Sequence, residues 1–165
     1  QTGGAGMIDA SVTGDAQVVA SIREQYRKIT TNVEQSIGRL TLKLLTQVKV
    51  NKLSGQVLNV RTGRLRRSIN QKVTKTPNAI TGIVGTNVKY ARAHELGFNG
   101  EVSVKAHLRQ IKMAWGRSIT PRTVEIRPHT RQVNLPPKSF LGSALADMTP
   151  EIMQTLQQSV RQGIL

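Results

Sequence analysis

Val19-Ala-Ser-Ile-Arg-Glu-Gln-Tyr-Arg-Lys-Ile29 decides the fold, because it starts a run in which an apolar residue recurs every three or four positions. The later members of this run are Val33, Ile37, Leu40, Leu44 and Val48. The spacing predicts one α-helix with a single apolar stripe, with Asp15 as its N-cap after Gly14. With a rise of about 1.5 Å per residue, the helix is roughly 45 to 50 Å long. Two interpretations of so long a stripe stay open: it packs against another subunit, or the helix bends near Gly38 and covers a local core.

After a polar, Gly-containing loop at residues 53–59, the sequence predicts a small antiparallel sheet. Thr62-Gly63 is typical of a cap and turn that opens one helical turn. The stretch 69–73 then alternates apolar and polar residues as a strand does. After a turn at Pro77-Asn78, residues 79–86 are expected to return as the second strand of a β-hairpin.

Two further helices are expected in the second half of the chain. Residues 88–96 predict a short helix that Gly97 stops. Pro136-Pro137 interrupts the chain later, and Ser139 is a candidate cap for one short turn. Thr149-Pro150-Glu151 predicts the start of the last helix, because it supplies a cap, a proline in the first turn and an acidic residue beside the positive end. The apolar stripe of that helix consists of Ile152, Leu156 and Val160.

Residues 99–135 contain an internal repeat. Two segments share one pattern, which predicts two β-strands joined at residues 116–121. They are Val104-Lys-Ala-His-Leu-Arg-Gln-Ile-Lys112 and Ile126-Arg-Pro-His-Thr-Arg-Gln-Val-Asn134. In both strands the basic residues alternate, so that they share one face. These residues are Lys105, His107, Arg109, Arg127, His129 and Arg131. Because like charges that face each other across strands are unfavourable, we expect this basic arm to be mobile alone and ordered by a partner.

Together these elements predict an α+β fold with a long N-terminal helix, a small antiparallel sheet, a protruding β-hairpin arm and a C-terminal helix. We expect residues 7–165 to form a single domain, into which residues 99–135 are inserted as the arm. Residues 1–6, Gln-Thr-Gly-Gly-Ala-Gly, resemble the end of a fusion tag with its linker, so that Met7 is the expected native start.

The chain is strongly basic: 24 Lys and Arg stand against 9 Asp and Glu, and no acidic residue lies between Glu34 and Glu95. A net charge of +15 attracts polyanions and repels further copies of the chain. The expected partners are therefore nucleic acid or acidic neighbouring subunits, and the alternative is a solvated basic surface without a specific partner. Single-stranded nucleic acid needs exposed rings for stacking, yet Tyr90 and Phe140 lie in sequences typical of packed residues. Any DNA contact is expected on duplex phosphates, without sequence readout.

The sequence predicts no enzyme. The absence of cysteine excludes disulfides, a thiol nucleophile and thiolate metal sites. Ala93-His-Glu-Leu-Gly-Phe98 lacks the second histidine of the zinc-protease helix, since Phe98 stands in its place. His107 and His129 could face each other, but two imidazoles alone make a poor metal site. No apolar run approaches the roughly 20 residues of a membrane span. We therefore expect no catalytic residue, no metal, no cofactor and no contact with a membrane.

A family resemblance lies in three segments taken in order. They are Thr62-Gly-Arg-Leu-Arg-Arg-Ser-Ile69, Gly85-Thr-Asn-Val-Lys-Tyr-Ala-Arg-Ala-His-Glu-Leu-Gly-Phe98 and Pro136-Pro-Lys-Ser-Phe-Leu-Gly-Ser-Ala-Leu145. The chain resembles the tail-completion (neck or minor tail) proteins of long-tailed bacteriophages and prophages, the family typified by Hong Kong 97 gene product ten. The positions that carry the resemblance are Thr62, Gly63, Leu65, Arg66, Ser68, Ile69, Gly85, Tyr90, Ala91, Glu95, Gly97, Pro137, Phe140 and Leu141. The basic repeat at 99–135 departs from the family, where this region is often shorter.

The resemblance implies a structural role in virion assembly. It implies a ring, a hexamer that matches the tail tube, at the head–tail junction. Its partners would be neighbouring tail-tube, terminator and head-closure proteins, with transient contact to passing double-stranded DNA. The protein would be made in the cytoplasm of the bacterial host and end in the tail or neck of the virion. A tail terminator protein is one alternative, and a non-specific duplex DNA-binding protein is another.

Ten motif residues are expected to define the fold or to form subunit contacts. They are Thr62, Gly63, Leu65, Arg66, Tyr90, Glu95, Gly97, Pro137, Phe140 and Leu141. Glu95 is the first acidic residue after the long basic stretch. We expect it to neutralise an arginine such as Arg64 or Arg66, within the chain or across an interface.

Overall fold

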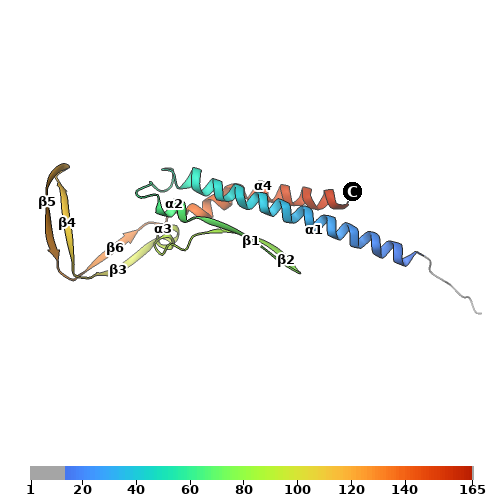
Figure 1. Cartoon of the computed structure of the whole chain (residues 1–165), viewed down its shortest axis with the longest axis horizontal. Coiled ribbons are helices and arrows are strands. Elements are labelled where there is room, and N and C mark those ends of the chain that lie inside the picture. The colour runs from blue at the N-terminus through green and yellow to red at the C-terminus, as the bar shows by residue number, and fades with distance from the viewer. Residues whose placement is uncertain (1–13, 165) are drawn as a thin grey trace, which may run out of the picture. The chain divides into compact units, whose positions relative to one another are not determined.

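The computed structural model of this chain describes residues 14–164, which form an α+β fold (Figure 1). The predicted fold class is confirmed: a long helix comes first, small antiparallel two-stranded sheets follow, and a second long helix comes last. The proposed tag remnant at residues 1–6 and the start at Met7 lie outside the described residues. The chain divides into two compact units. The first contains the described residues up to Thr46, Asn70–Val84 and those from Leu145, and the second contains Gln47–Ile69 and Gly85–Ala144.

The described residues contain helices α1 (Asp15–Thr46), α2 (Arg64–Ser68), α3 (Ala91–Leu96) and α4 (Phe140–Ile164), with α1 continuing into a π-helical segment, η1 (Gln47–Lys52). The strands pair as β1 (Asn70–Thr76) with β2 (Ala79–Gly85), β3 (Phe98–Val104) with β6 (His129–Leu135), and β4 (His107–Ala114) with β5 (Arg117–Ile126). The hairpin predicted around Pro77-Asn78 is therefore confirmed.

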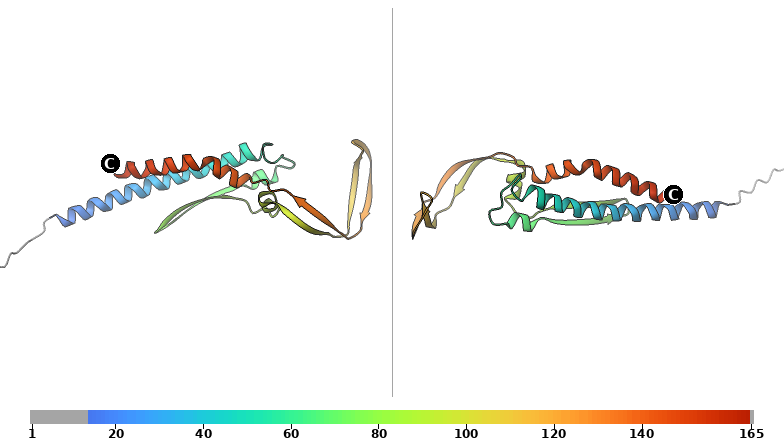
Figure 2. Two further views of the ribbon diagram at one scale, coloured as in Figure 1. Left: turned by 180° about the vertical axis from the view of Figure 1, so that it is seen from behind. Right: turned by 90° about the horizontal axis from the view of Figure 1, so that it is seen from above.

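In the first unit, α1 and α4 lie side by side and run in opposite directions, as all views agree (Figures 1 and 2). Inside their interface the buried hydroxyls of Ser36 and Ser159 share a hydrogen bond of 2.6 Å. Closer to the C-terminal end of α1, Lys43 forms an ion pair of 2.6 Å with Glu151 on α4. Leu40 is among the buried apolar residues of this unit.

The last turn of α4 meets α1 at Ile29. Gly163 is buried there, and a β-carbon on it would lie only 2.8 Å from the Ile29 backbone. Glycine thus permits the close approach of the two helices. The β1–β2 hairpin also belongs to this unit, and Lys75 on β1 forms an ion pair of 2.5 Å with Glu34 on α1.

The start and course of α1 correct two details of the sequence-based expectation. Asp15 is the first helical residue rather than the cap, and the carbonyl of Gly14 accepts the first hydrogen bonds, from the backbone N–H groups of Gln17 and Val18. A carboxylate in the first turn is nevertheless favourable beside the positive end of the helix dipole. The helix does not break near Gly38, which was part of one of the two interpretations left open, because α1 is continuous to Thr46.

The last helix begins nine residues earlier than predicted, at Phe140 instead of Thr149. Pro150 lies inside it and lacks only one backbone donor. The Thr149 hydroxyl donates to the carbonyl of Leu145 at 2.9 Å, so it bonds within the helix instead of capping a new one. The physical reason for the early start is a cap supplied by Glu95, described below.

In the second unit, residues 98–135 form a long antiparallel ribbon, as predicted, but its turn is shorter. Ala114 pairs with Arg117, so the turn consists of Trp115 and Gly116 alone, whose φ angles are 49° and 77°. Two residues with positive φ are typical of the tight hairpin turns that match strand twist. The tip expected around residues 115–121 contains this turn but extends too far, because β5 already begins at Arg117.

The internal repeat marks a corner in this ribbon, where β3–β6 gives way to β4–β5 (Figure 1). Val104 pairs with His129 and His107 pairs with Ile126, so the register is the same on both sides of the corner. The ring Nδ1 atoms of His107 and His129 each donate to the carbonyl two residues earlier, at 2.9 Å. In this register the two histidines do not lie opposite each other, because His129 pairs with Val104 and His107 with Ile126, so the possibility that they face each other is excluded.

Candidate functional site

Glu95 caps the N-terminus of α4 in the second unit. Its carboxylate accepts hydrogen bonds from the Ser139 hydroxyl and from the backbone N–H groups of Phe140, Leu141 and Gly142, at 2.7 to 2.9 Å. The first N–H groups of a helix have no partner within the helix, so a carboxylate there satisfies them and also meets the positive end of the helix dipole. We call this arrangement the Glu95 cap.

The electrostatics of Glu95 follow from this cap. Burial raises the pKa of its carboxyl, while the hydrogen bonds from Leu141, Gly142, Ser139 and Phe140 lower it, and the net pKa lies below the ordinary value of 4.5. Hydrogen bonds to the ionised form outweigh desolvation here. Glu95 therefore acts as an anionic cap, and its oxygens are already engaged.

Within the chain, Glu95 does not pair with the arginines that the sequence suggested. We expected Arg64 or Arg66 to pair with it, but the charge of Glu95 is met by a helix end that lies 45 to 47 positions later in the sequence. The backbone N–H groups of a helix terminus form a cluster of fixed donors, whereas a surface arginine must be immobilised before it can pair.

Gly97 and Pro137 continue this junction, since Gly97 directly follows α3 with φ of 78°. A β-carbon on Gly97 would lie 3.0 Å from the Leu135 carbonyl oxygen and from the Pro137 nitrogen. Phe140 is fully buried and Leu141 half-buried, so these motif residues have packing roles.

Tyr90 is 42% exposed and stacks edge-on against His94, with ring centroids 5.9 Å apart. The expectation that Tyr90 is packed is therefore wrong, whereas the same expectation for Phe140 is confirmed.

The first motif segment borders a hollow in the second unit. Gly63 takes a left-handed conformation before α2, with φ of 68°, and the Arg67 side chain folds back to donate to the Thr62 carbonyl at 3.2 Å. Leu65 is half-buried and Arg66 exposed. The hollow measures about 680 Å³, and the residues that line it are Leu53, Leu58, Asn59, Val60, Arg61, Thr62, Gly63, Arg64, Leu65, Arg66, Arg67, Tyr90 and His94. We call it the basic hollow.

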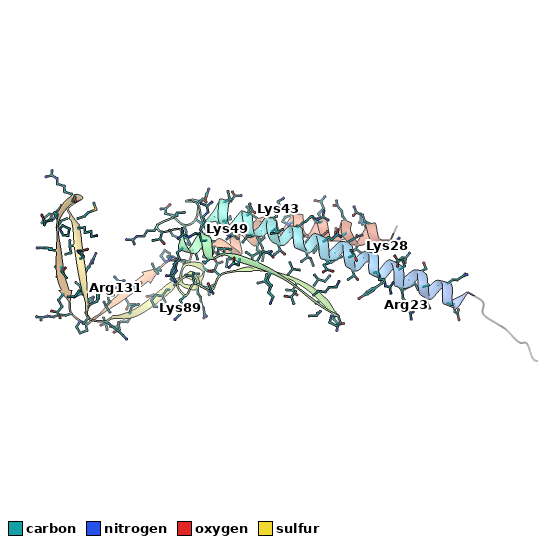
Figure 3. All side chains as sticks on the ribbon, in the orientation of Figure 1. Arg23, Lys28, Lys43, Lys49, Lys89 and Arg131 are labelled. Atoms are coloured by element: carbon teal, nitrogen blue, oxygen red, sulfur yellow. The ribbon has the colours of Figure 1, made fainter. Side chains whose placement is uncertain are left out.

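The residues of the basic arm are all exposed: Lys105, His107, Arg109, Arg127, His129 and Arg131. Arg131 lies on β6 (Figure 3) opposite Val102, and Arg109 on β4 lies opposite Val124. The expected repulsion between like charges directly across the strands is thus avoided at Arg109 and Arg131, because the register places a valine opposite each of them. Arg122 lies opposite Ile111 on the same face as Arg109, and Trp115 at the turn is 98% exposed.

The first part of α1 forms a further uncovered surface in the first unit. Every residue from Asp15 to Lys28 is exposed, because α4 reaches only Ile29. Ile22 and Tyr26 are 59% and 63% exposed although they belong to the apolar stripe. Figures 1 and 2 show this stretch extending beyond the last described residues of α4, and Figure 3 labels Arg23 and Lys28 on it. We call residues 15–28 the uncovered stretch of α1.

Within residues 14–164, no three His, Asp or Glu side chains gather as a metal site would require. None of the helices in this part of the chain is long and apolar enough to cross a membrane. No family model, curated protein or solved structure matches the chain.

Sequence reasoning missed the basic hollow and the role of Ser139 and Gly142 in the Glu95 cap. The run from Arg61 to Arg67, which holds four arginines and no acidic residue, was the available signal for the hollow. No local signal connects Glu95 with the N–H groups of α4, because the contact joins segments far apart in the sequence.

Proposed function

We propose that this chain is a structural virion-assembly protein of the tail-completion type, which forms a ring at the head–tail junction of a long-tailed bacteriophage or prophage. The observation that supports it best is that the three segments of the family resemblance contact one another in the second unit. Glu95 from the second segment caps the helix that begins in the third. The hydroxyl of Ser68 in the first segment bonds that of Thr86 in the second at 2.7 Å.

The uncovered stretch of α1 supports the ring. It is about 21 Å long at the usual helical rise, and it carries the apolar side chains of Val19, Ile22 and Tyr26 in water. Apolar side chains aligned along one face of a helix are typical of a surface that another subunit covers. In this proposal a neighbouring subunit of the ring packs on that stripe.

The test is assembly of the full chain, measured by light scattering over protein and salt concentration, alone and with tail-tube protein added. Because the net charge of +15 opposes self-association, screening by salt should promote assembly. Ile22→Asp combined with Tyr26→Asp should abolish assembly without unfolding the chain, since both side chains are exposed.

Gln17→Asp combined with Ser21→Asp is the matched control, because it adds the same charge to the polar face of the same stretch. We expect this control to assemble like the unmodified chain. A strict monomer under every condition, including with tail proteins, would remove the ring proposal.

Non-specific binding of duplex DNA is a second candidate, favoured by one face of the β4–β5 ribbon. This face carries Arg109 and Arg122 with His107 and no acidic residue. Salt-sensitive duplex binding by the isolated chain, with a salt slope that falls by about two in Arg109→Ala/Arg122→Ala, would support it. Equal slopes for the two proteins would contradict it.

A further inference from the structure

We propose that the basic hollow binds a segment of a partner protein in which acidic and apolar side chains alternate. This inference names a partner chemistry for a set of residues other than the uncovered stretch of α1, on which the ring proposal rests. It rests on the lining of the hollow and would hold for the isolated chain.

The charge of the hollow calls for an anionic ligand. Arg61, Arg64, Arg66 and Arg67 all contribute to its lining, and no acidic residue does. The two acidic residues that flank them in sequence are Glu34 and Glu95. Glu34 is paired with Lys75, and the oxygens of Glu95 are engaged by Ser139 and the N-terminus of α4. Arg61, Arg64 and Arg66 are therefore available to carboxylates from outside, which arginines bind with paired, charge-assisted hydrogen bonds, whereas Arg67 already donates to the Thr62 carbonyl.

The floor of the hollow calls for apolar groups on the same ligand. Leu53 is buried, Leu58 and Leu65 are half-buried, and Val60 is half exposed to solvent. A volume of about 680 Å³ lies within the range of protein ligand sites and accommodates several side chains. Apolar side chains that bind there would bury the exposed parts of these residues, which free ions or phosphates cannot do.

This combination favours a protein segment over nucleic acid. A duplex presents a convex row of phosphates, which matches a basic ridge and leaves a concave apolar floor empty. An acidic–apolar segment satisfies both parts of the hollow: its carboxylates pair with the arginines, and its apolar side chains enter the floor.

The experiment uses the full chain and fluorescence anisotropy with short labelled probes. The first probe is a peptide in which Asp and Glu alternate with Leu, the second replaces each Leu with Ser, and the third is a random-sequence DNA duplex. We expect the first peptide to bind about tenfold more tightly than the second, because only it can use the apolar floor.

Two variants and one control locate the binding. Arg64→Ala/Arg66→Ala should weaken binding of the first peptide by about tenfold and leave the fold intact, since both side chains are exposed. Val60→Ser should weaken the first peptide more than the second. Lys72→Ala/Arg161→Ala removes two exposed positive charges of the first unit, outside the hollow, and should leave binding unchanged.

Several outcomes would overturn the proposal. Absence of peptide binding would do so. Equal affinity for the two peptides would also do so, and so would a loss of affinity in Lys72→Ala/Arg161→Ala as large as that in Arg64→Ala/Arg66→Ala. Either of the last two results would mean that the peptide is attracted by net charge alone. Tighter binding of the duplex that depends on Arg64 and Arg66 would assign the hollow to nucleic acid instead. Failure of the chain to form rings leaves the peptide result unaffected, so the two proposals can fail separately.

Discussion

The two halves of α1 have the same apolar spacing but opposite surroundings. From Ile29 onward the stripe packs against α4 and the β1–β2 hairpin, with Leu40 only 8% exposed. From Asp15 to Lys28 the same stripe faces solvent. Apolar periodicity therefore predicts a helix and the face that will be buried, but not whether this chain or another one covers that face.

The largest difference between the two halves is expected when one aliphatic residue in each half is replaced with alanine. Leu40→Ala should destabilise the chain by about 3 kcal/mol, since it leaves a cavity in the packed half. Ile22→Ala should change the free energy of unfolding by less than about 0.5 kcal/mol, because the side chain is mostly in water and alanine favours the helix. Urea denaturation at low protein concentration measures both values. A loss at Ile22 as large as at Leu40 would mean that the isolated chain already covers this stretch.

A second comparison concerns two carboxylates: that of Glu95, which caps α4, and that of Glu101, which is exposed. Glu95→Gln tests the first. Loss of the anionic cap should lower stability by about 1 to 2 kcal/mol at neutral pH, because glutamine loses the charge and replaces one of the two accepting oxygens with an NH2 donor that opposes the N–H groups of α4. Glu101→Gln is the control, since Glu101 is exposed on β3. It should unfold at the same urea concentration as the unmodified chain.

The pH dependence of this difference has a definite sign. The pKa of Glu95 is lowered in the folded state, so its contribution is fully present above the ordinary value of 4.5 and is lost as the pH falls through the folded pKa. The stabilities of the unmodified chain and Glu95→Gln should therefore converge below pH 4.5. Thermal melting of both proteins from neutral to acidic pH would check this, and a gap that persists in acid would contradict an anionic cap.

Local patterns predicted much of the fold, because helix periodicity, the Pro77-Asn78 turn and strand alternation are all short-range signals. The start of α4 was predicted nine residues late, since its first donors are satisfied by Glu95 from a distant segment. The absence of an arginine partner for Glu95 within the described part of the chain has the same reason. The cap could not be predicted from sequence alone, because it depends on that long-range contact, whereas the arginines of the run from Arg61 to Arg67 were a local signal for the basic hollow.

The ribbon shows a second limit of sequence reasoning. The repeat indicated two basic strands, and we expected their like charges to face each other. Register decides this, and the two-residue turn at Trp115-Gly116, together with the irregularity between Ile111 and Met113, sets the register. One residue more or less in the turn would shift the register by one position, and each residue of β4 would then lie opposite a different residue of β5.

The smallest effect on folding is expected for Arg109→Ala combined with Arg131→Ala. Both side chains are exposed and lie opposite valines, so their removal should change stability by less than about 0.5 kcal/mol. Head-to-tail joining should nevertheless fall in a virion-completion assay, since the basic face would lose charge that attracts acidic neighbours or passing DNA. Gln110→Ala/Thr130→Ala, on the opposite face of the same strands, should join normally. Normal joining by the double arginine variant would remove the role of the arm.

Hydrogen exchange on the isolated chain adds to this prediction, because it measures whether the amides of the ribbon are protected like those in the packed half of α1. Each part of the ribbon has only two strands, and isolated two-stranded pairs are marginally stable in water. We therefore expect amides at residues 104–131 to exchange faster than those of α1 after Ile29, and fastest at Trp115-Gly116, where Trp115 is almost fully exposed. Slow exchange throughout residues 104–131 would mean that the ribbon is rigid without a partner. In that case, the loss of joining in the arginine variant would reflect a preformed basic surface rather than an arm that a partner orders.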